Sequence, residues 1–588
     1  MKQKHKSVQH ADGASLLDDA FKACRIHFGY AAGFSALLNV LYLTPTIYML
    51  QVYDRVVPTR GVMTLVFLTL VLTFAIGTLS YLDYIRSRLL VRASARLDHQ
   101  LSGPILRILL SAPRPNGRSA QSAMREFDAL RQTMTGAGIL ALFDAPWTPV
   151  YVLICFGINP LLGALALVGV LLLVGITALN EHATKGRMEA ANEAGNHAYM
   201  AQEFSRNAAG VITALGMGKA LTKRHLGGRM RSIRLQAEAS FYAGRYMTLS
   251  RFLRLLLQSL AMGLGAFLAI EGKLSPGAIF AATLLVSRAI APTEQIIGAW
   301  KGLAQARSGY ASLKALFATN PPEADRTLLP APAGLLQVKN LSVASPTGGR
   351  PILNDLAFQI QPGEIIGVIG PSGAGKSTMV RAIVGALTPE RGVIRMDGAN
   401  VEDWNRDYLA RHIGYLPQES GLLEGTIKEN IARFRTELED IEFLDRKVVA
   451  AAQLCGAHEM ILSLPHAYET RLGFGGTGLS AGQAQRVALA RALFDEPALI
   501  ILDEPNAHLD AEGEVALVQT LVRTKARGAT AIVVAHRTGV LAAVDRVMIL
   551  RAGQIEAFGP RDEVVQRIPE SSMDAAARRV VSAQSRQA

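Results

Sequence analysis

A glycine-rich stretch directly after an apolar run carries the strongest chemical signal in the chain. The run Ile365–Ile369 predicts a strand, and residues 370–378 read GPSGAGKST. A strand that opens through glycines into a helix leaves unpaired backbone N–H groups and the positive helix end around one small volume, which suits phosphate. Lys376 can reach the β- and γ-phosphates, and the Ser377 hydroxyl can ligate Mg²⁺. The pattern predicts nucleoside triphosphate binding by Gly370, Pro371, Ser372, Gly373, Ala374, Gly375, Lys376, Ser377 and Thr378.

Two carboxylates follow a second apolar run. Residues 498–502 read ALIIL, and Asp503 and Glu504 come next. In open parallel sheets, ligands bind outside the carboxyl ends of the strands. We predict that Asp503 organises Mg²⁺ and its waters and that Glu504 polarises the attacking water. Such an acidic pair is weak evidence alone, but after a phosphate loop it indicates hydrolysis of the bound triphosphate.

Another helix start lies between these two motifs. Residues 479–483 read LSAGQ, and the helical run AQRVALARAL follows. Ser480 or a neighbour would begin this helix, so its N-terminus is a second phosphate-binding end. One γ-phosphate needs only one such cradle within a chain, so the second hints at a site completed by another chain. For this motif in isolation, a simple helix cap is the alternative.

These motifs lie in a region with the pattern of an α/β domain. Short apolar, strand-like runs are separated by helical stretches, which predicts a mainly parallel core sheet. The runs include residues 336–338, 365–369, 413–416, 499–502 and 531–534. We place this P-loop nucleotide-binding domain at 336–567, after a proline-rich linker at 320–335. We assign no function to the polar tail at 568–588.

The first half of the chain is basic and yet contains long uncharged stretches. Residues 1–320 hold 33 Lys/Arg and 16 Asp/Glu, against 28 and 32 in the remainder. Membrane topology explains this combination better than a nucleic-acid surface does, so we expect no nucleic acid partner. About 20 apolar residues cross a bilayer as a helix. Six spans are predicted at residues 29–53 and 61–82, two within 132–180 that turn at 157–160, and near 255–270 and 276–299.

The positive residues indicate how these spans are oriented. The connecting segments 85–138 and 181–251 are rich in Lys and Arg, whereas the opposite loops are short and nearly uncharged. Positive loops stay in the cytoplasm, so both termini and the nucleotide-binding domain are predicted to be cytoplasmic. Apolar residues in the long loops recur at helical spacing, which predicts membrane helices that continue into the cytosol. We divide this half into a short N-terminus, 1–28, and a six-helix transmembrane domain, 29–319.

Three charged residues fall inside the predicted spans. They are Asp144, Arg288 and Glu294. A charge inside a bilayer is costly, so each is a candidate functional residue. The three could line a polar path for cargo, or they could pair with other helices or lie near an interface.

The motifs together resemble those of ATP-binding cassette exporters, and the resemblance covers most of the chain. In that family, the pattern at 370–378 is the Walker A loop, LSAGQ at 479–483 is the signature motif, and residues 503–504 end the Walker B motif. The resemblance implies the type I exporter fold, with a six-span α-helical membrane domain fused to an α/β P-loop domain. It also implies ATP and Mg²⁺ as cofactors.

Three further residues match the family's motifs. Gln418, in YLPQ, matches the Q-loop residue that contacts Mg²⁺ and reports to the membrane helices. Asp510 matches the D-loop, and His536, just after the predicted strand 531–534, matches the switch histidine near the γ-phosphate. The resemblance thus implies catalytic roles for Lys376, Glu504 and His536 and metal binding by Ser377, Gln418 and Asp503.

In the family, two cassettes close head to tail over two ATPs. The signature residues Ser480, Gly482 and Gln483 would then complete the partner's site, as Asp510 would border it. One chain has one membrane half and one cassette, so the resemblance implies a homodimer with twelve spans. The two cytoplasmic loops would couple the cassette to the membrane near Gln418.

Two positions depart from the family pattern. The signature motif has Ala481 where glycine is commoner, a small change that we expect to be tolerated. More tellingly, residues 341–346 read LSVASP and lack the aromatic residue that usually stacks on adenine, with Ser345 near that place. The departure at Ser345 predicts looser preference for the base.

Within exporters, the membrane half is similar to bacterial type I secretion ATPases of the PrtD-like kind. The resemblance depends on YDRVVP at 53–58, DAPWTP at 144–149 and ALGM at 214–217. It implies export of unfolded polypeptides with an uncleaved C-terminal signal, from the bacterial inner membrane. It also implies a periplasmic membrane-fusion adaptor and an outer-membrane channel as partners.

Two other functions stay open at this point. The cassette motifs are equally compatible with export of a lipid, a glycolipid or a small amphiphile. A membrane-anchored ATPase that regulates a partner without transport is an alternative of another class. An adaptor and an outer channel would distinguish polypeptide export from lipid export, whereas ATP turnover without any transported cargo would indicate the regulator.

Overall fold

The chain folds into two compact units, Met1–Pro322 and Glu323–Ala588. The structure is a computed structural model that describes residues 13–111, 118–320, 326, 328–345, 348–437, 439–507, 509, 511–535 and 538–566. Each unit has hydrophobic clusters of its own. We call the first the helical unit and the second the cassette.

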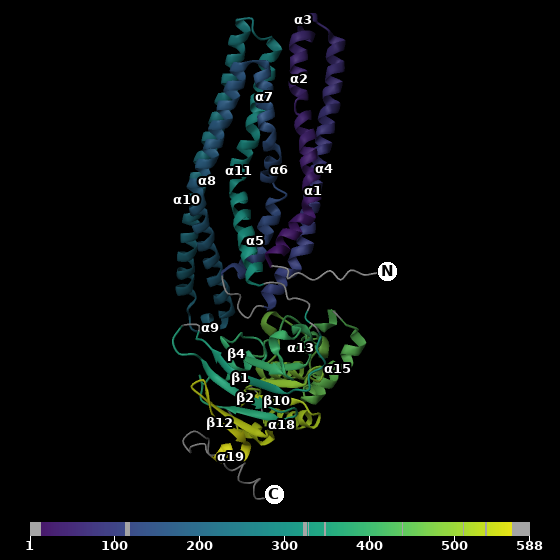
Figure 1. Ribbon diagram of the computed structural model, residues 1–588, viewed down its shortest axis with the longest axis vertical. Coiled ribbons are helices and arrows are strands. Elements are labelled where there is room, and N and C mark those ends of the chain that lie inside the picture. The colour runs from purple at the N-terminus through teal and green to yellow at the C-terminus, as the bar shows by residue number, and fades with distance from the viewer. Residues whose placement is uncertain are drawn as a thin grey trace. The chain divides into compact units, whose positions relative to one another are not determined.

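The helical unit consists of long helices and their short connections (Figure 1). Its main elements are α1 (Gly13–Leu41), α2 (Thr44–Gln51), the π-helical turn η1 (Val52–Val56), α3 (Val57–Thr59), α4 (Val62–Ser111), α5 (Arg118–Thr133), α6 (Ala137–Asp144), α7 (Thr148–Ile158), α8 (Pro160–Asn207), α9 (Ala209–Ala214), α10 (Gly218–Ile270) and α11 (Pro276–Thr319). The sequence-predicted turn at 157–160 falls between α7 and α8, where the Asn159 side chain caps α8.

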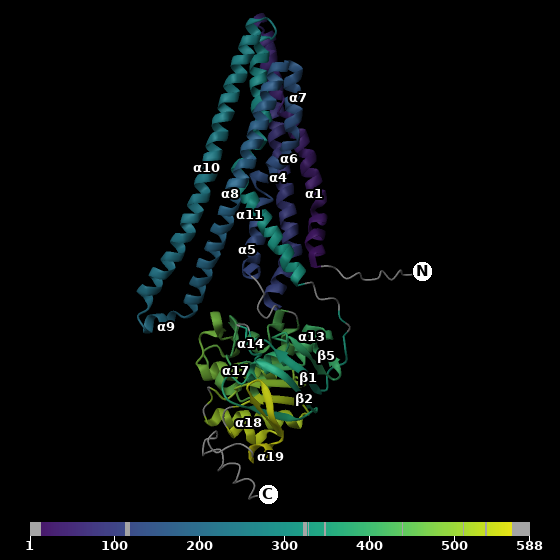
Figure 2. The same ribbon diagram turned by 60° about the vertical axis from the view of Figure 1, so that its left-hand side comes forward.

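Six helical stretches of the described chain are long and apolar enough to cross a membrane, as predicted. They are Leu16–Thr59, Val62–Leu110, Ala137–Ile158, Pro160–Arg206, Gly218–Ile270 and Pro276–Thr319. Helices α4, α8 and α10 have 50, 48 and 53 residues. At about 1.5 Å per residue, each is more than twice as long as a bilayer core of about 30 Å. These helices therefore continue beyond the membrane, and Figure 2 shows α8 and α10 side by side with α9 joining them.

The cassette contains two main sheets. The larger has the order β12-β11-β3-β10-β9-β6, parallel except for the edge strand β12. The smaller is antiparallel, with the order β2-β1-β4-β5. The predicted strand at 336–338 is the start of β1 and so lies in the smaller sheet, not in the parallel one. Its antiparallel partners are β2, the next strand along the chain, and β4, and a short apolar run does not show which sheet it joins.

The cassette combines strands and helices, and its main elements are labelled in Figure 1 where there is room. They are β1 (Leu336–Val343), β2 (Leu353–Ile360), β3 (Ile365–Ile369), α12 (Lys376–Ile383), β4 (Arg391–Met396), β5 (Ala399–Asn400), α13 (Arg406–Arg411), β6 (Ile413–Leu416), α14 (Ile427–Ile431), α15 (Ile441–Leu454), α17 (Ala481–Leu493), β9 (Leu499–Asp503), α18 (Ala511–Ala526), β10 (Thr530–Val534), β11 (Arg546–Arg551), β12 (Gln554–Pro560) and α19 (Arg561–Gln566).

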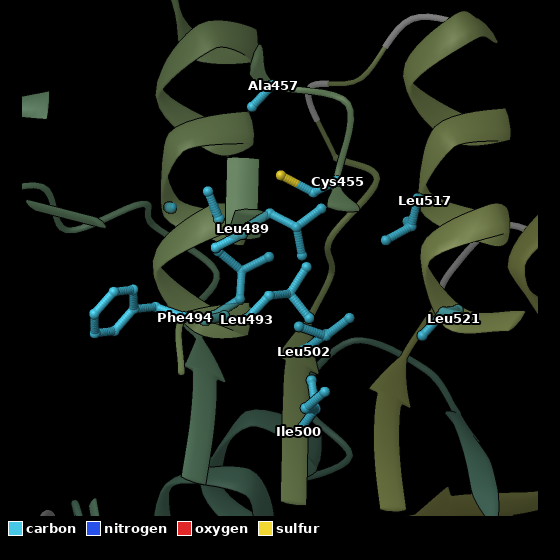
Figure 3. Packing of buried hydrophobic residues seen from close by; sticks show 14 of the residues in the cluster. Cys455, Ala457, Leu489, Leu493, Phe494, Ile500, Leu502, Leu517 and Leu521 are labelled. Carbon is cyan, nitrogen blue, oxygen red and sulfur yellow. The ribbon is translucent and has the colours of Figure 1, made fainter. Parts of the chain in front are cut away.

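The central strand β9 is buried on both faces. Leu499 and Ile501 pack into one hydrophobic cluster with the smaller sheet and α12, whereas Ile500 and Leu502 pack into another with α17 and α18. Figure 3 shows the second cluster, with Ile500 and Leu502 facing side chains of α17. Successive side chains of a strand point to opposite faces, so a fully apolar strand is expected in the middle of a sheet covered on both sides. This packing fixes where β9 delivers its two terminal carboxylates.

Candidate functional site

The predicted phosphate-binding loop lies between β3 and α12. Residues 370–375 form the loop, and Lys376, Ser377 and Thr378 form the first turn of α12. Gly370 (φ 156°) has no room for a side chain, because a Cβ there would lie 2.1 Å from the Leu550 carbonyl oxygen. Gly375 has φ 99°, in the left-handed region that favours glycine. The glycines thus allow the tight turn that directs the N-terminus of α12 into the site.

Lys376 lies in the centre of this loop. It is 6% exposed, and its Nζ donates hydrogen bonds to the carbonyl oxygens of Gly370 (2.8 Å) and Pro371 (3.1 Å). Burial lowers the pKa of the ammonium group, and the nearby carboxylates of Glu504 and Asp503 act in the opposite direction. The charge is therefore held in place at the loop, within electrostatic range of both predicted catalytic carboxylates.

Asp503 ends strand β9 and is 1% exposed. Burial raises the pKa of its carboxyl group, and a hydrogen bond with the Ser377 side chain opposes that rise. Its Oδ1 atom has no hydrogen-bond partner among the described residues. A buried carboxylate oxygen without a partner is costly unless something binds it. An unsatisfied oxygen beside a serine hydroxyl is the hard-oxygen donor set that Mg²⁺ prefers, so these residues fit the metal that the motifs imply.

Glu504 follows directly and has a left-handed backbone conformation (φ 53°). Such a conformation is strained for a residue with a side chain, and strained residues cluster at functional sites. Its Oε2 atom lies 3.4 Å from Nε2 of Gln418, which follows β6. The fold thus brings the phosphate loop, Gln418, Asp503 and Glu504 to one edge of the parallel sheet, where each of the three strands ends.

The signature motif begins helix α17. The Ser480 hydroxyl accepts a hydrogen bond from the Gln483 backbone N–H (3.3 Å), and the Gln483 side chain accepts one from the Ser480 N–H (2.9 Å). This reciprocal capping box leaves Gly482 in the first turn of the helix. Within the part of the chain that the structure describes, no hydrogen bond joins Ser480 to the phosphate loop of the same chain. Asp510 and His536 lie outside the described residues.

Two residues near Asp503 belong to none of the sequence motifs. Arg381 on α12 and Tyr415 on β6 share a hydrogen bond, and the positive charge of Arg381 lowers the pKa of Asp503. Burial raises the pKa of Tyr415. Neither residue belongs to a phosphate-binding pattern, so only the folded arrangement of α12 and β6 reveals them.

The charges inside the predicted spans pair with other helices. Asp144 Oδ1 accepts a hydrogen bond from Arg86 (2.9 Å) and another from Asn39 (3.0 Å). Glu294 forms an ion pair with Arg254 (2.8 Å). The Arg288 guanidinium lies 3.9 Å from the centre of the Tyr42 ring. The sequence left open whether these charges line a polar path for cargo or pair with other helices, and the contacts support pairing.

The motif at 53–58 connects η1 to the start of α11. Asp54 lies in η1, and its carboxylate accepts hydrogen bonds from the Ser275 hydroxyl (2.6 Å) and the Gly277 N–H (2.8 Å) at the start of α11. The Tyr53 ring stacks on Phe280, with 4.3 Å between ring centres. In the motif at 144–149, Thr148 donates to the Ala289 carbonyl of α11 (3.1 Å). The two motifs therefore form hydrogen bonds that connect the first and third spans to α11, the sixth span.

Fold and site together define an ATP-binding cassette exporter. Residues 353–507 match the ABC transporter family. A solved structure of a bacterial Atm1-family ABC exporter with ATP bound superposes with a TM-score of 0.81 at 20% sequence identity, covering 94% of this chain and 99% of the other. The predicted fold class is confirmed.

Sequence identity to curated proteins shows which kind of ABC exporter the chain is. The chain is 41% identical over 568 residues to the type I secretion system ATP-binding protein PrsD of Rhizobium meliloti (strain 1021), covering 95% of each. It is 28% identical to the toxin RTX-I translocation ATP-binding protein of Actinobacillus pleuropneumoniae, over 90% of this chain and 75% of that protein. The chain belongs to the type I secretion system ATP-binding proteins. It is a multi-pass membrane protein that binds nucleotide and couples ATP hydrolysis to transport.

Proposed function

We propose that this protein is the ATP-hydrolysing exporter of a type I secretion system and moves an unfolded polypeptide with an uncleaved C-terminal signal out of the cytoplasm. The observation that carries the proposal is the 41% identity to PrsD along 95% of both chains. The similarity includes the helical unit as well as the cassette. The toxin and leukotoxin translocation proteins of other bacteria support a polypeptide as the cargo.

In this proposal, the described site residues divide the chemistry of ATP hydrolysis. Lys376 and the backbone N–H groups of the phosphate loop bind the β- and γ-phosphates. Ser377, Gln418 and Asp503 would hold Mg²⁺, which supplies charge neutralisation at the phosphates when bound. Glu504 orients and polarises the attacking water from the end of β9. His536 would act beside the γ-phosphate.

The active form is proposed to be a homodimer. A capped helix start at Ser480, with no bond to its own phosphate loop in the described residues, is suited to the nucleotide of a second copy. Gly482 and Gln483 in the same turn would complete that site, with Asp510 at its border. A dimer of this chain would have twelve spans.

We further propose a place in the cell envelope. The loop charges predict that both termini and the cassette lie in the cytoplasm, and the similarity to the bacterial secretion protein PrsD implies the bacterial inner membrane. A periplasmic membrane-fusion adaptor and an outer-membrane channel would continue the path for the cargo. This arrangement is expected for a polypeptide exporter and is not needed by an exporter of lipids.

The proposal is tested by comparing the proteins in the medium of cells that express wild type or Glu504→Gln at equal levels. We expect a few proteins without N-terminal signal peptides to disappear from the medium and accumulate inside the cells. An unchanged set of secreted proteins would contradict polypeptide export. Altered membrane lipids in the variant would then indicate a lipid cargo, and unchanged lipids with normal ATP turnover in wild type would indicate a regulator.

A further inference from the structure

The segment that contains Gln418 is hydrogen-bonded to the C-terminal end of α17, the helix that begins with the signature motif. This segment, residues 417–424, has no regular secondary structure. Arg491, in the last turn of α17, donates a hydrogen bond from Nη1 to the Gly421 carbonyl (2.8 Å) and one from Nη2 to the Ser420 carbonyl (2.5 Å). Hydrogen bonds from a charged donor are among the strong ones in proteins. The two acceptors come two and three residues after Gln418, so the bonds restrain the backbone next to it.

A second arginine, Arg433, connects the C-terminal end of α17 to strand β6, the strand that precedes Gln418. Arg433 donates to the carbonyls of Arg491 (3.1 Å) and Ala492 (3.2 Å) at the end of α17. It also donates to the carbonyl of Ile413 (3.0 Å) at the start of β6. A cation is favourable here, because the last carbonyls of a helix have no partner within the helix. Arg433 thus fixes the other end of the strand that leads to Gln418.

Two observations show that this junction is closely constrained. A Cβ atom on Gly414 of β6 would lie 2.1 Å from the Ala492 carbonyl oxygen, so strand and helix end are in direct backbone contact. Arg433 itself has a left-handed backbone (φ 55°), as does Phe434 (φ 56°). Burial lowers the pKa of Arg433 to about 10 and also lowers that of Arg491. The fold keeps a strained backbone and two partly buried charges here, which indicates that the connection is needed.

Helix α17 is a rigid body between this junction and the signature motif. Its 13 residues span about 20 Å at 1.5 Å per residue. Leu489, Leu493 and Phe494 are at most 2% exposed, and they pack with Ile500 and Leu502 of β9 (Figure 3). The N-terminal end of α17 therefore carries Ser480, and the middle of the helix packs on β9, the strand that leads to Glu504. The C-terminal end is hydrogen-bonded to the Gln418 segment.

We propose that Arg491 is a positioning residue that sets the place of Gln418 beside Glu504. The inference rests on the proposed roles of Gln418 and Ser480 and goes further by linking them physically. A displacement of Ser480 by the partner's nucleotide moves α17, and Arg491 transmits this displacement to the Gln418 segment of the chain's own site. Arg491 thereby contributes to the coupling between the two nucleotide sites of a dimer.

The test is a double-mutant cycle on ATP turnover by the full-length protein reconstituted in lipid vesicles. We expect Arg491→Ala to lower the maximal turnover about tenfold, because it removes two charge-assisted bonds that hold a catalytic segment. Adding it to Gln418→Ala should cause no further loss, since both changes affect one step. We also expect the dependence of turnover on ATP concentration to lose its cooperativity in Arg491→Ala.

Two more variants separate positioning from folding. Arg491→Lys keeps the charge but not the two-pronged bond, and we expect an intermediate turnover. Arg435 is the matched control, because it is half-buried near the same helix end but bonds the acidic side chains of Glu439 and Asp495. Wild-type turnover in Arg491→Lys, additive losses in the double variant, or the same non-additivity for Arg435→Ala would each overturn the proposal. The readout is ATP turnover alone, so the result is independent of whether the cargo is a polypeptide.

Discussion

Buried charges have different surroundings in the two units of the molecule. In the helical unit, Asp144 is bonded to Arg86 of α4 and to Asn39 of α1, and Glu294 is paired with Arg254. In the cassette, Asp503 is buried more deeply than either of these carboxylates, yet one of its oxygens has no protein partner in the described part of the chain. The paired charges of the helical unit connect helices, whereas an unsatisfied buried carboxylate such as Asp503 is typical of a ligand site.

The reason is the cost of removing a charge from water. A buried carboxylate is tolerated when an opposite charge and hydrogen bonds satisfy it, and its loss then leaves the partner uncompensated. A carboxylate that the protein leaves incompletely satisfied is costly until a ligand binds it. The comparison therefore predicts that mutations of Asp144 affect stability, whereas mutations around Asp503 affect ATP chemistry.

The largest effect on stability is expected in the helical unit. Asp144→Ala removes one partner of the Arg86 guanidinium, which is 4% exposed, and leaves its bonds to Asp83 and Ser35 in place. We expect a loss of about 1–3 kcal/mol in the free energy of unfolding, the cost of removing one hydrogen-bond partner of a buried charged group. The measurement is thermal unfolding of the purified protein in detergent. Asp19→Ala, which breaks an exposed pair with Lys22, is the control, and equal melting of both variants would contradict the account.

A change at the phosphate loop should instead spare stability and weaken nucleotide binding. Lys376→Ala removes a charge-assisted contact to phosphate, and we expect ATP to bind about 10–100-fold more weakly. Direct titration of ATP onto the purified protein measures this effect. The exposed Lys339→Ala is the control. Unchanged ATP affinity in Lys376→Ala would remove this residue from the site.

In both the helical unit and the cassette, the sequence predicts local elements but not the contacts between distant residues. Local patterns predict the six spans and the phosphate loop, because apolar length and glycine spacing act within one segment. The pairing of Asp144 with Arg86 was left open, because it joins residues that are 58 positions apart. The same holds for Arg491, since bonds from a guanidinium to loop carbonyls have no sequence signature. For the same reason, no pattern reveals Arg381 and Tyr415 near Asp503.

The pH dependence of stability offers a finer test of Asp503. Burial raises the pKa of this carboxyl group above its ordinary value of 3.8, so the folded protein binds the proton more tightly than the unfolded chain does. Stability therefore falls as pH rises from the ordinary pKa to the raised one. Asp503→Asn removes the buried charge, and we expect the melting temperature in Mg²⁺-free buffer to rise by about 2–4 °C.

This gain should shrink as pH is lowered below the ordinary pKa, where the wild-type carboxyl group is protonated in both states. The variant should at the same time lose Mg²⁺-dependent ATP turnover. A stabilised protein with lower activity is the expected behaviour of a residue kept for chemistry. A lower melting temperature in Asp503→Asn at neutral pH would show that the carboxylate is satisfied by the protein.

The smallest effect is expected where the adenine-stacking aromatic is missing. Ser345→Tyr should tighten ATP binding roughly 2–10-fold, since aromatic stacking is worth about 0.5–1.5 kcal/mol. Wild type should discriminate little between ATP and GTP, and titration of both nucleotides measures this. Ser345→Leu controls for added apolar area. Equal affinities in wild type and Ser345→Tyr would place the base elsewhere.

The central claim is that the carboxylate of Glu504, delivered by the buried strand β9, performs the step that drives transport. The most direct measurement is ATP turnover and ATP retention by purified Glu504→Gln, with the exposed Glu512→Gln on α18 as control. We expect turnover to fall by about 10²–10⁴-fold, the contribution of a general base, while ATP stays bound. Turnover in Glu504→Gln within about tenfold of wild type would contradict the assignment and with it the account of the site.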